Sequence, residues 1–147
     1  MKAEQKNLAD AEKHLRAALK ADPQMAEAAY NLGVLLMKDR PEEGIQYVRK
    51  ANELRPDIPK YGNALASYLG EKGDQTKAIQ ALHETISRQP GNGDAYLMLG
   101  EIYQRQGKPE RASAVYVQAL RNKALSNSDR ERIGAKLREL AAAKPRK

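Results

Sequence analysis

The sequence predicts an all-α fold, a right-handed α-solenoid of stacked helix–turn–helix units, for this chain of 147 residues. Three observations support this prediction. The apolar residues are mainly Leu, Ala, Ile, Val and Met, and all seven aromatic residues are Tyr, a mixture that favours helices. Leucines, small residues and prolines recur with a period of about 34 residues. Glycine, proline and capping residues separate segments of helical length.

The first helix, expected at residues 4–21, matches only the second helix of a repeated unit. Its apolar residues Leu8, Leu15, Ala18 and Leu19 therefore lack the first helix against which they would normally pack. Three explanations remain open: the chain is truncated or begins with a tag, the face mediates self-association, or the face is simply exposed.

The helices that follow form units of two. Leu32 and Leu36 are one helical turn apart and share a face, and the small Gly33 lets a partner helix approach closely. The second helix of each unit carries a matching small residue and a larger apolar one. We call each set of residues that recurs at the repeat period a column. The columns are Leu32, Leu65 and Leu99; Gly33, Ala66 and Gly100; Leu36, Leu69 and Tyr103; Ala11, Gly44, Ala78 and Ala112; Leu15, Val48, Leu82 and Tyr116; and Ala18, Ala51, Thr85 and Ala119.

Glycine and proline mark where these helices begin and end. Gly73 and Gly107 are typical helix stops, Pro109 suits a first helical turn, and Pro56 and Pro90 close second helices. One residue is missing near positions 38–41, and we place this deletion in the turn. After the first helix, we expect helices near residues 24–38, 41–54, 58–71, 74–88, 93–106, 109–122 and 128–143.

The last helix is predicted to cap the stack. It begins with a capping box from Ser128 to Glu131, and a stack of repeats requires a terminal helix with a polar outer face. The residues expected to pack inward are Ile133, Leu137, Leu140 and Ala141, and those expected outside are Arg130, Arg132, Lys136 and Arg138.

These residues resemble the tetratricopeptide repeat, a helix–turn–helix unit of about 34 residues with a small residue after Leu and a paired Ala in the second helix. The best match is the segment from Ala95 to Tyr103, continuing through Gly107, Ala112 and Tyr116. The resemblance covers roughly residues 8–124. It implies one domain over residues 1–147, with a partial repeat at 1–23, repeats at 24–56, 57–90 and 91–124, and a capping helix with a basic tail at 126–147.

Several positions depart from the family pattern. Ala29 and Gly62 stand where the family usually has a large residue, Gly44 replaces the second-helix Ala, and Ala124 replaces the closing Pro. We therefore expect the middle units to pack less tightly. Gly62 and Gly70 also fall within one predicted helix, and each interior glycine costs about 1 kcal/mol relative to Ala, so the third unit is the expected weak point.

The resemblance implies a concave groove, lined by the first helices, that binds a protein or peptide without catalysis. Asn31 and Lys60 match two positions with which some family members grip the terminal carboxylate of chaperone tails, but Ala64 stands where those members have Arg. The candidate groove residues are Tyr30, Asn31, Val34, Met37, Lys60, Asn63, Ser67, Leu97, Met98, Glu101, Gln104 and Arg105. The alternative is a homo-oligomeric assembly module that uses the first helix or the basic cap.

The net charge of +7 is concentrated at one end. Residues 1–120 carry 17 Lys and Arg against 16 Asp and Glu, whereas residues 121–147 carry nine against three, a difference of +6. This placement favours a solubilising tail. Contact with nucleic acid or an anionic membrane is the weaker alternative, because no aromatic stacking platform accompanies the charge.

The sequence offers little support for an enzyme. The chain has no Cys, which excludes disulfides, thiolate metal sites and a Cys nucleophile. His14 and His83 fall in different units without metal-ligand spacing, and no phosphate loop or nucleophile elbow is present. We therefore expect no cofactor. Because the sequence contains no signal peptide and no membrane-spanning segment, we expect a cytoplasmic protein if the chain is complete, and an undetermined compartment if it is a fragment.

Overall fold

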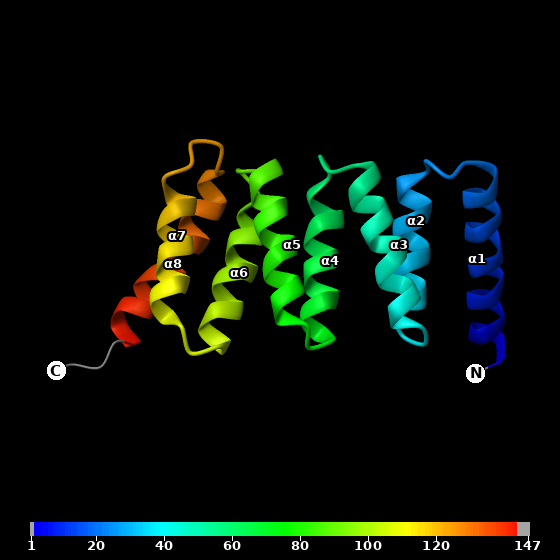
Figure 1. Ribbon diagram of the computed structural model, residues 1–147, viewed down its shortest axis with the longest axis horizontal. Coiled ribbons are helices and arrows are strands. Elements are labelled where there is room, and N and C mark those ends of the chain that lie inside the picture. The colour runs from blue at the N-terminus through cyan, green and yellow to red at the C-terminus, as the bar shows by residue number, and fades with distance from the viewer. Residues whose placement is uncertain (1, 144–147) are drawn as a thin grey trace. The chain divides into compact units, whose positions relative to one another are not determined.

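A computed structural model describes residues 2–143 of the chain, and this part folds into eight α-helices (Figure 1). Every predicted helix is confirmed, and the observed ends differ from the expected ones by at most two residues. The helices are α1 (Lys2–Ala21), α2 (Ala26–Leu36), α3 (Pro41–Leu54), α4 (Pro59–Glu71), α5 (Gln75–Arg88), α6 (Gly93–Arg105), α7 (Pro109–Leu120) and α8 (Asn127–Ala143).

The contacts divide the chain into two compact units. The first unit extends to Leu69 and contains α1, α2, α3 and most of α4, and the second begins at Gly70 and contains α5 to α8. The boundary falls inside the predicted repeat 57–90, at one of the two glycines that the sequence marked as a weak point. The predicted organisation as one repeat domain stays a prediction.

The first unit has its core between α1, α2 and α3. Leu32, Leu36 and Ala51 are buried there, together with Leu19 of α1. The prediction that the apolar residues of α1 lack a packing partner is therefore only partly correct. Leu19 is buried and Leu15 is half-buried against this core, whereas Leu8 leaves 51% of its surface exposed.

Helices α2 and α3 approach each other at two glycines. A Cβ atom on Gly33 would lie 2.6 Å from Val48 Cγ2 and 2.7 Å from the carbonyl oxygen of Gly44. A Cβ on Gly44 would in turn lie 2.7 Å from the carbonyl oxygen of Gly33. The expectation that Gly44 loosens the packing of this unit is wrong, because the missing methyl group lets the two backbones come closer together.

In the second unit, α6 packs against both α7 and α8. A Cβ on Gly100 would overlap the ring of Tyr116, which is fully buried, and the Tyr116 hydroxyl donates a hydrogen bond to Gln104 Oε1 at 3.1 Å. At the start of α6, the carboxyl of Asp129 fills the space where a side chain on Gly93 would lie. Small residues on α6 therefore create the room for both neighbouring helices.

Helix α8 covers the second unit largely as predicted. Ile133 and Leu140 are buried and Leu137 is half-buried. Ala141 is exposed, which corrects its assignment to the packed face, because it lies at the edge of the helix face on which Ile133 and Leu140 are buried.

The turns within the units contain glycines at the helix ends, as the sequence predicted. Gly73 and Gly107 occupy the same position in successive repeats and have positive φ angles of 89° and 72°, a conformation that glycine adopts without steric cost. The shorter spacing in the first full repeat arises because α2 ends at Leu36, whereas α4 and α6 continue two residues past their equivalent positions, Leu69 and Tyr103.

Candidate protein-binding surface

An aromatic pair with a cation above it links α2 and α4 in the first unit. The ring centroids of Tyr30 and Tyr61 are 5.1 Å apart at an interplanar angle of 39°. The Lys60 Nζ atom lies 4.9 Å from the Tyr30 centroid and 5.7 Å from the Tyr61 centroid. A cation is attracted to the negative face of an aromatic ring, so these contacts hold Lys60 in place while its side chain remains exposed.

The predicted residues around this cluster differ in accessibility. On α2, Asn31 is exposed, Val34 has 39% of its surface exposed and Tyr30 is half-buried, and Met37, which directly follows α2, is also half-buried. The Met37 sulfur lies against Gly44, so part of this side chain has a packing role. The accessible residues form what we call the α2/α4 surface, which comprises Tyr30, Asn31, Val34, Lys60, Asn63 and Ser67.

The predicted residues of the second unit lie along α6 and form a separate candidate surface. Arg105 is exposed and Glu101 and Met98 are half-buried. Leu97 retains only 7% exposure, so its assignment as an apolar anchor for a ligand is corrected: the side chain is part of the packed interior. Gln104 is exposed but already accepts a hydrogen bond from Tyr116.

The charge on α6 also affects the buried ring beside it. Burial raises the pKa of Tyr116 to about 12, and the negative charges of Glu101 and Glu139 act in the same direction. The phenol therefore stays protonated at neutral pH and donates to Gln104, which accounts for the structural role of that amide.

The sequence did not identify Tyr61 as part of a site. Tyr61 is buried, whereas the candidate groove residues were chosen at outward-facing positions. The available signal was its position next to the exposed Lys60. Only the side-by-side placement of α2 and α4 shows that Tyr61 is the second ring beneath the same cation.

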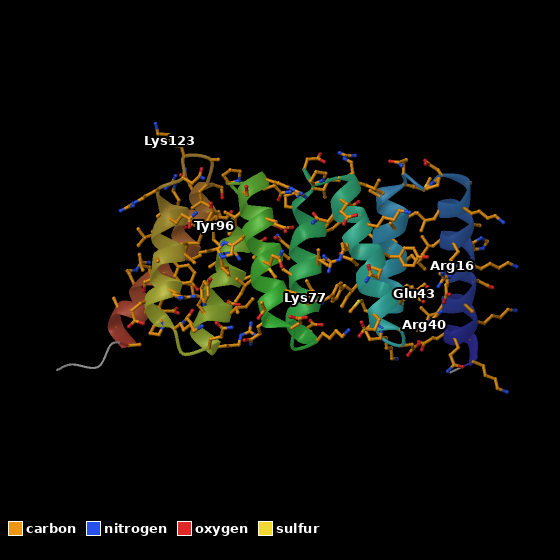
Figure 2. All side chains as sticks on the ribbon, in the orientation of Figure 1. Arg16, Arg40, Glu43, Lys77, Tyr96 and Lys123 are labelled. Carbon is orange, nitrogen blue, oxygen red and sulfur yellow. The ribbon has the colours of Figure 1, made fainter. Side chains whose placement is uncertain are left out.

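A cluster of ion pairs joins α1 to the start of α3 and was also not predicted. The Arg16 guanidinium contacts Glu12 at 2.9 Å and Glu43 at 2.6 Å, and it donates to the Tyr47 hydroxyl at 3.2 Å. Arg40 also pairs with Glu12. Figure 2 shows Arg16, Arg40 and Glu43 in the space between these two helices.

The charges of this cluster stabilise one another. Hydrogen bonds from Arg40 and Arg16 lower the pKa of Glu12, and the bonds to Glu43 and Glu12 raise the pKa of Arg16. All members are partnered within the first unit, so the cluster serves to hold α1 against α3.

The basic cap is likewise used internally. Arg132 pairs with Asp94 of α6 at 3.0 Å and with Asp129 at 2.9 Å. Arg130 donates to the backbone oxygens of Leu120 and Asn122 at 2.6 Å and 2.5 Å. These two arginines fasten α8 to its own unit, and the basic residues of the terminal tail at 144–147 lie outside the described residues.

The remaining candidates for chemistry are dispersed. His14 is exposed on α1 and His83 is exposed on α5. Within residues 2–143, no three His, Asp or Glu side chains are grouped so that they could hold a metal ion. No helix in the same range combines the length and the apolar character needed to cross a membrane.

Comparison with known proteins relates this geometry to one family. Tetratricopeptide repeat models match residues 2–58 and 71–133. Human tetratricopeptide repeat protein 7A is 29% identical over 124 residues, which are 84% of this chain and 14% of that protein. The chain therefore spans about one seventh of the length of this relative.

Solved structures show the same fold. A crystal structure of MamA superposes with a TM-score of 0.67 at 27% identity, covering 87% of this chain and 67% of that one. A second MamA structure gives 0.66 at 25% identity, covering 96% and 86%. PilF of Pseudomonas aeruginosa shares the fold, with a TM-score of 0.64, 22% identity and coverage of 99% and 72%. Together with the all-helical fold of residues 2–143, these matches show that the chain belongs to the tetratricopeptide repeat family.

Proposed function

We propose that this protein is a non-catalytic interaction module that binds a segment of a partner protein on the α2/α4 surface. Tetratricopeptide repeats generally mediate contacts between proteins, and the family supports this general role for the chain. One observation carries the finer assignment. The exposed Lys60 is held over Tyr30 and Tyr61, next to the exposed side chains of α2.

The chemistry of this surface defines the partner segment. Val34 and the accessible edge of Tyr30 offer an apolar contact, Asn31 offers an amide that can bond a peptide backbone, and Lys60 offers a positive charge. The cation–π contacts fix Lys60 before binding, so less side-chain entropy is lost when a ligand is bound. The surface suits a segment that presents a carboxylate close to an apolar side chain.

The exposed and half-buried residues of α6 form the second part of the proposal. Glu101 and Arg105 place opposite charges four residues apart along one helix, with Met98 beside them. Such a surface can bond a polar segment, and we propose it as a separate contact for a partner. Testing each surface by its own substitution shows whether one or both are used.

The test is binding of peptides selected from a random library against the wild-type protein, measured by calorimetry. We expect Lys60→Glu to weaken selected peptides at least about tenfold, because it reverses the central charge. Val34→Asp should weaken them similarly by removing the apolar contact. Arg105→Glu tests α6, and Lys20→Glu on α1 is the control, since it makes the same charge change at an exposed position. Peptides that bind Lys60→Glu and Val34→Asp as tightly as wild type would refute the assignment.

A second candidate function is self-association. It is favoured by the 51% exposure of Leu8 and the incomplete burial of Leu15 on α1. Leu8 lines an open cleft with Leu35 and Leu36 of α2, and a group of apolar side chains that is open to solvent suits an intermolecular contact. This function uses a different face of the first unit from the peptide-binding proposal, so the two are tested independently.

A further inference from the structure

Helix α1 of the first unit carries all of its lysines on one side. Lys2, Lys6, Lys13 and Lys20 follow one another at intervals of four, seven and seven residues. With about 3.6 residues per turn, these intervals place the four side chains within about 40° of the helix circumference and along about 27 Å of its length. We call this row the lysine stripe. All four side chains are exposed, and Figure 2 shows long side chains on α1 that point away from α2 and α3.

The packed side of α1 is separate from the lysine stripe. Leu15 and Leu19 pack against the core of the first unit, and Leu8 lines the cleft with Leu35 and Leu36. The three leucines of α1 lie at least about 100° around the helix from the stripe. The lysines are therefore not needed to hold α1 in the fold.

The positions of the stripe face solvent in the other units as well. The residues one, two and three repeats after Lys13 are Gln46, Gln80 and Ala114, and those after Lys20 are Glu53, Ser87 and Arg121. All six are exposed, although their helices α3, α5 and α7 are second helices within the repeats. These two columns thus stay open in every repeat, and only α1 fills both with lysine.

The positive charge of the stripe is local and uncompensated. Residues 1–69 carry 11 Lys and Arg against 10 Asp and Glu, a difference of only +1. Within residues 2–143, none of the four lysines forms an ion pair. Of the acidic residues of α1, Glu12 is paired with Arg16 and Arg40, Glu4 lies on the opposite side of the helix, and Asp10 flanks the stripe.

We propose that the lysine stripe binds the surface of an anionic lipid bilayer. The residues between the lysines on this side are Ala9 and Ala17, whose short side chains let all four ammonium groups reach one plane. Neither alanine can act as an apolar anchor, so the contact is electrostatic, peripheral and reversible. The proposal goes beyond protein binding and uses a different helix from the α2/α4 surface.

The shape of the stripe favours a plane over a nucleic acid. A helix in the major groove of a duplex has phosphates on both flanks, whereas these lysines occupy one narrow side of α1. Single strands are usually held by aromatic side chains on which the bases stack, and α1 contains no aromatic residue. Lipid headgroups diffuse laterally, so they can adjust to lysines that are unequally spaced.

The test is co-sedimentation of the whole chain with phosphatidylcholine vesicles that contain roughly one-third phosphatidylserine, at low salt. Wild type should bind these vesicles and not pure phosphatidylcholine. The double variant Lys13→Gln with Lys20→Gln should bind about 30-fold more weakly, because each lysine near an anionic surface contributes about fivefold to affinity. Asp10→Asn removes the flanking negative charge and should strengthen binding about fivefold. Salt at about 1 M should abolish binding, since the Debye length falls to about 3 Å.

The matched control is the double variant Lys108→Gln with Lys123→Gln. It removes the same charge at exposed positions away from α1, so it should bind as wild type does. Glutamine and lysine have similar helix propensity, and circular dichroism should show an unchanged helix content for all variants. Sedimentation equilibrium of the free protein tests the second candidate function, self-association, which a strict monomer would refute.

Three results would overturn the proposal. The first is a wild-type protein that does not bind the anionic vesicles at low salt. The second is an equal loss of binding in the two double variants, because binding would then follow overall charge rather than the stripe. The third is tighter binding to a short DNA duplex than to the vesicles, with the same loss in Lys13→Gln with Lys20→Gln, which would make the partner a nucleic acid.

Discussion

Helices α2 and α3 of the first unit and helices α6 and α7 of the second meet at the same column of the repeat but fill it differently. In the first unit, Gly33 faces Gly44, so two backbones are in close approach and Val48 packs beside them. In the second unit, Gly100 faces the buried ring of Tyr116. A glycine at this column is thus required by a neighbouring backbone in one unit and by a neighbouring side chain in the other.

This difference determines whether a second substitution can compensate for a larger residue at the glycine. A ring can be replaced by a smaller side chain, which restores space. A carbonyl oxygen is part of every residue, so the space that it occupies can be regained only by moving a helix. The two glycines of this column, Gly33 and Gly100, should therefore differ in the stability cost of the same substitution.

The largest effect is expected from Gly33→Ala. The new methyl group would collide with the Gly44 carbonyl and with Val48, so α2 and α3 must separate, at a cost of about 3 kcal/mol or more in unfolding free energy. Urea unfolding measures this loss, and hydrogen exchange should locate it in α2 and α3. Adding Val48→Ala should not restore stability, because the carbonyl remains; restoration would contradict a backbone contact.

Gly100→Ala should be less costly, about 1–3 kcal/mol, because it displaces a side chain rather than a backbone. In the double variant Gly100→Ala with Tyr116→Leu, the smaller side chain provides room for the methyl group. A double-mutant cycle should then give a favourable coupling of at least about 1 kcal/mol. Additive losses would show that the ring is not what excludes the methyl group.

A glycine outside this column should behave in the opposite way. Gly70 lies near the end of α4, and no described atom lies within 4 Å of a Cβ placed there. Gly70→Ala should therefore raise the unfolding free energy by about 0.5–1 kcal/mol, because alanine is the better helix former. A decrease in melting temperature would contradict the helical conformation of this residue.

The smallest effect should come from the ion pairs between α1 and α3. The pKa of Glu12 is lowered in the folded state, so its ionised form favours folding above the unfolded-state pKa, and this contribution is lost as pH falls through the lowered value. Amides of α1 should exchange faster in acid, and Glu12→Gln should reduce that pH dependence. The partners are partly exposed, and added salt should weaken the effect.

Local geometry explains which parts of the fold could be predicted from the sequence. Helix spacing and turn chemistry depend on neighbours along the chain, so all eight helices and the glycine turns at Gly73 and Gly107 were predicted. The columns at Gly33 and Gly100 followed because the same contact recurs at a fixed period. The looser packing expected from Gly44 was wrong, since a pattern of residue types does not contain the distance between two backbones.

The candidate site was less accessible to prediction. The exposure of Asn31, Val34 and Lys60 agreed with their assignment to outward positions of first helices. The Tyr30–Tyr61 pair and the cluster around Arg16 combine residues from separate helices that share no column of the repeat. The burial of Leu97 depends on neighbours in three dimensions, which helical periodicity alone does not supply.

The position of Lys60 above two phenol rings also has a spectroscopic consequence. The chain contains no Trp or Phe, so its near-ultraviolet signal comes from tyrosine alone. A carboxylate that draws the ammonium group away from Tyr30 and Tyr61 changes the electric field at both rings. Partner binding should then shift the tyrosine absorption and the ring proton resonances of an unlabelled protein, so that the surface reports its own occupancy.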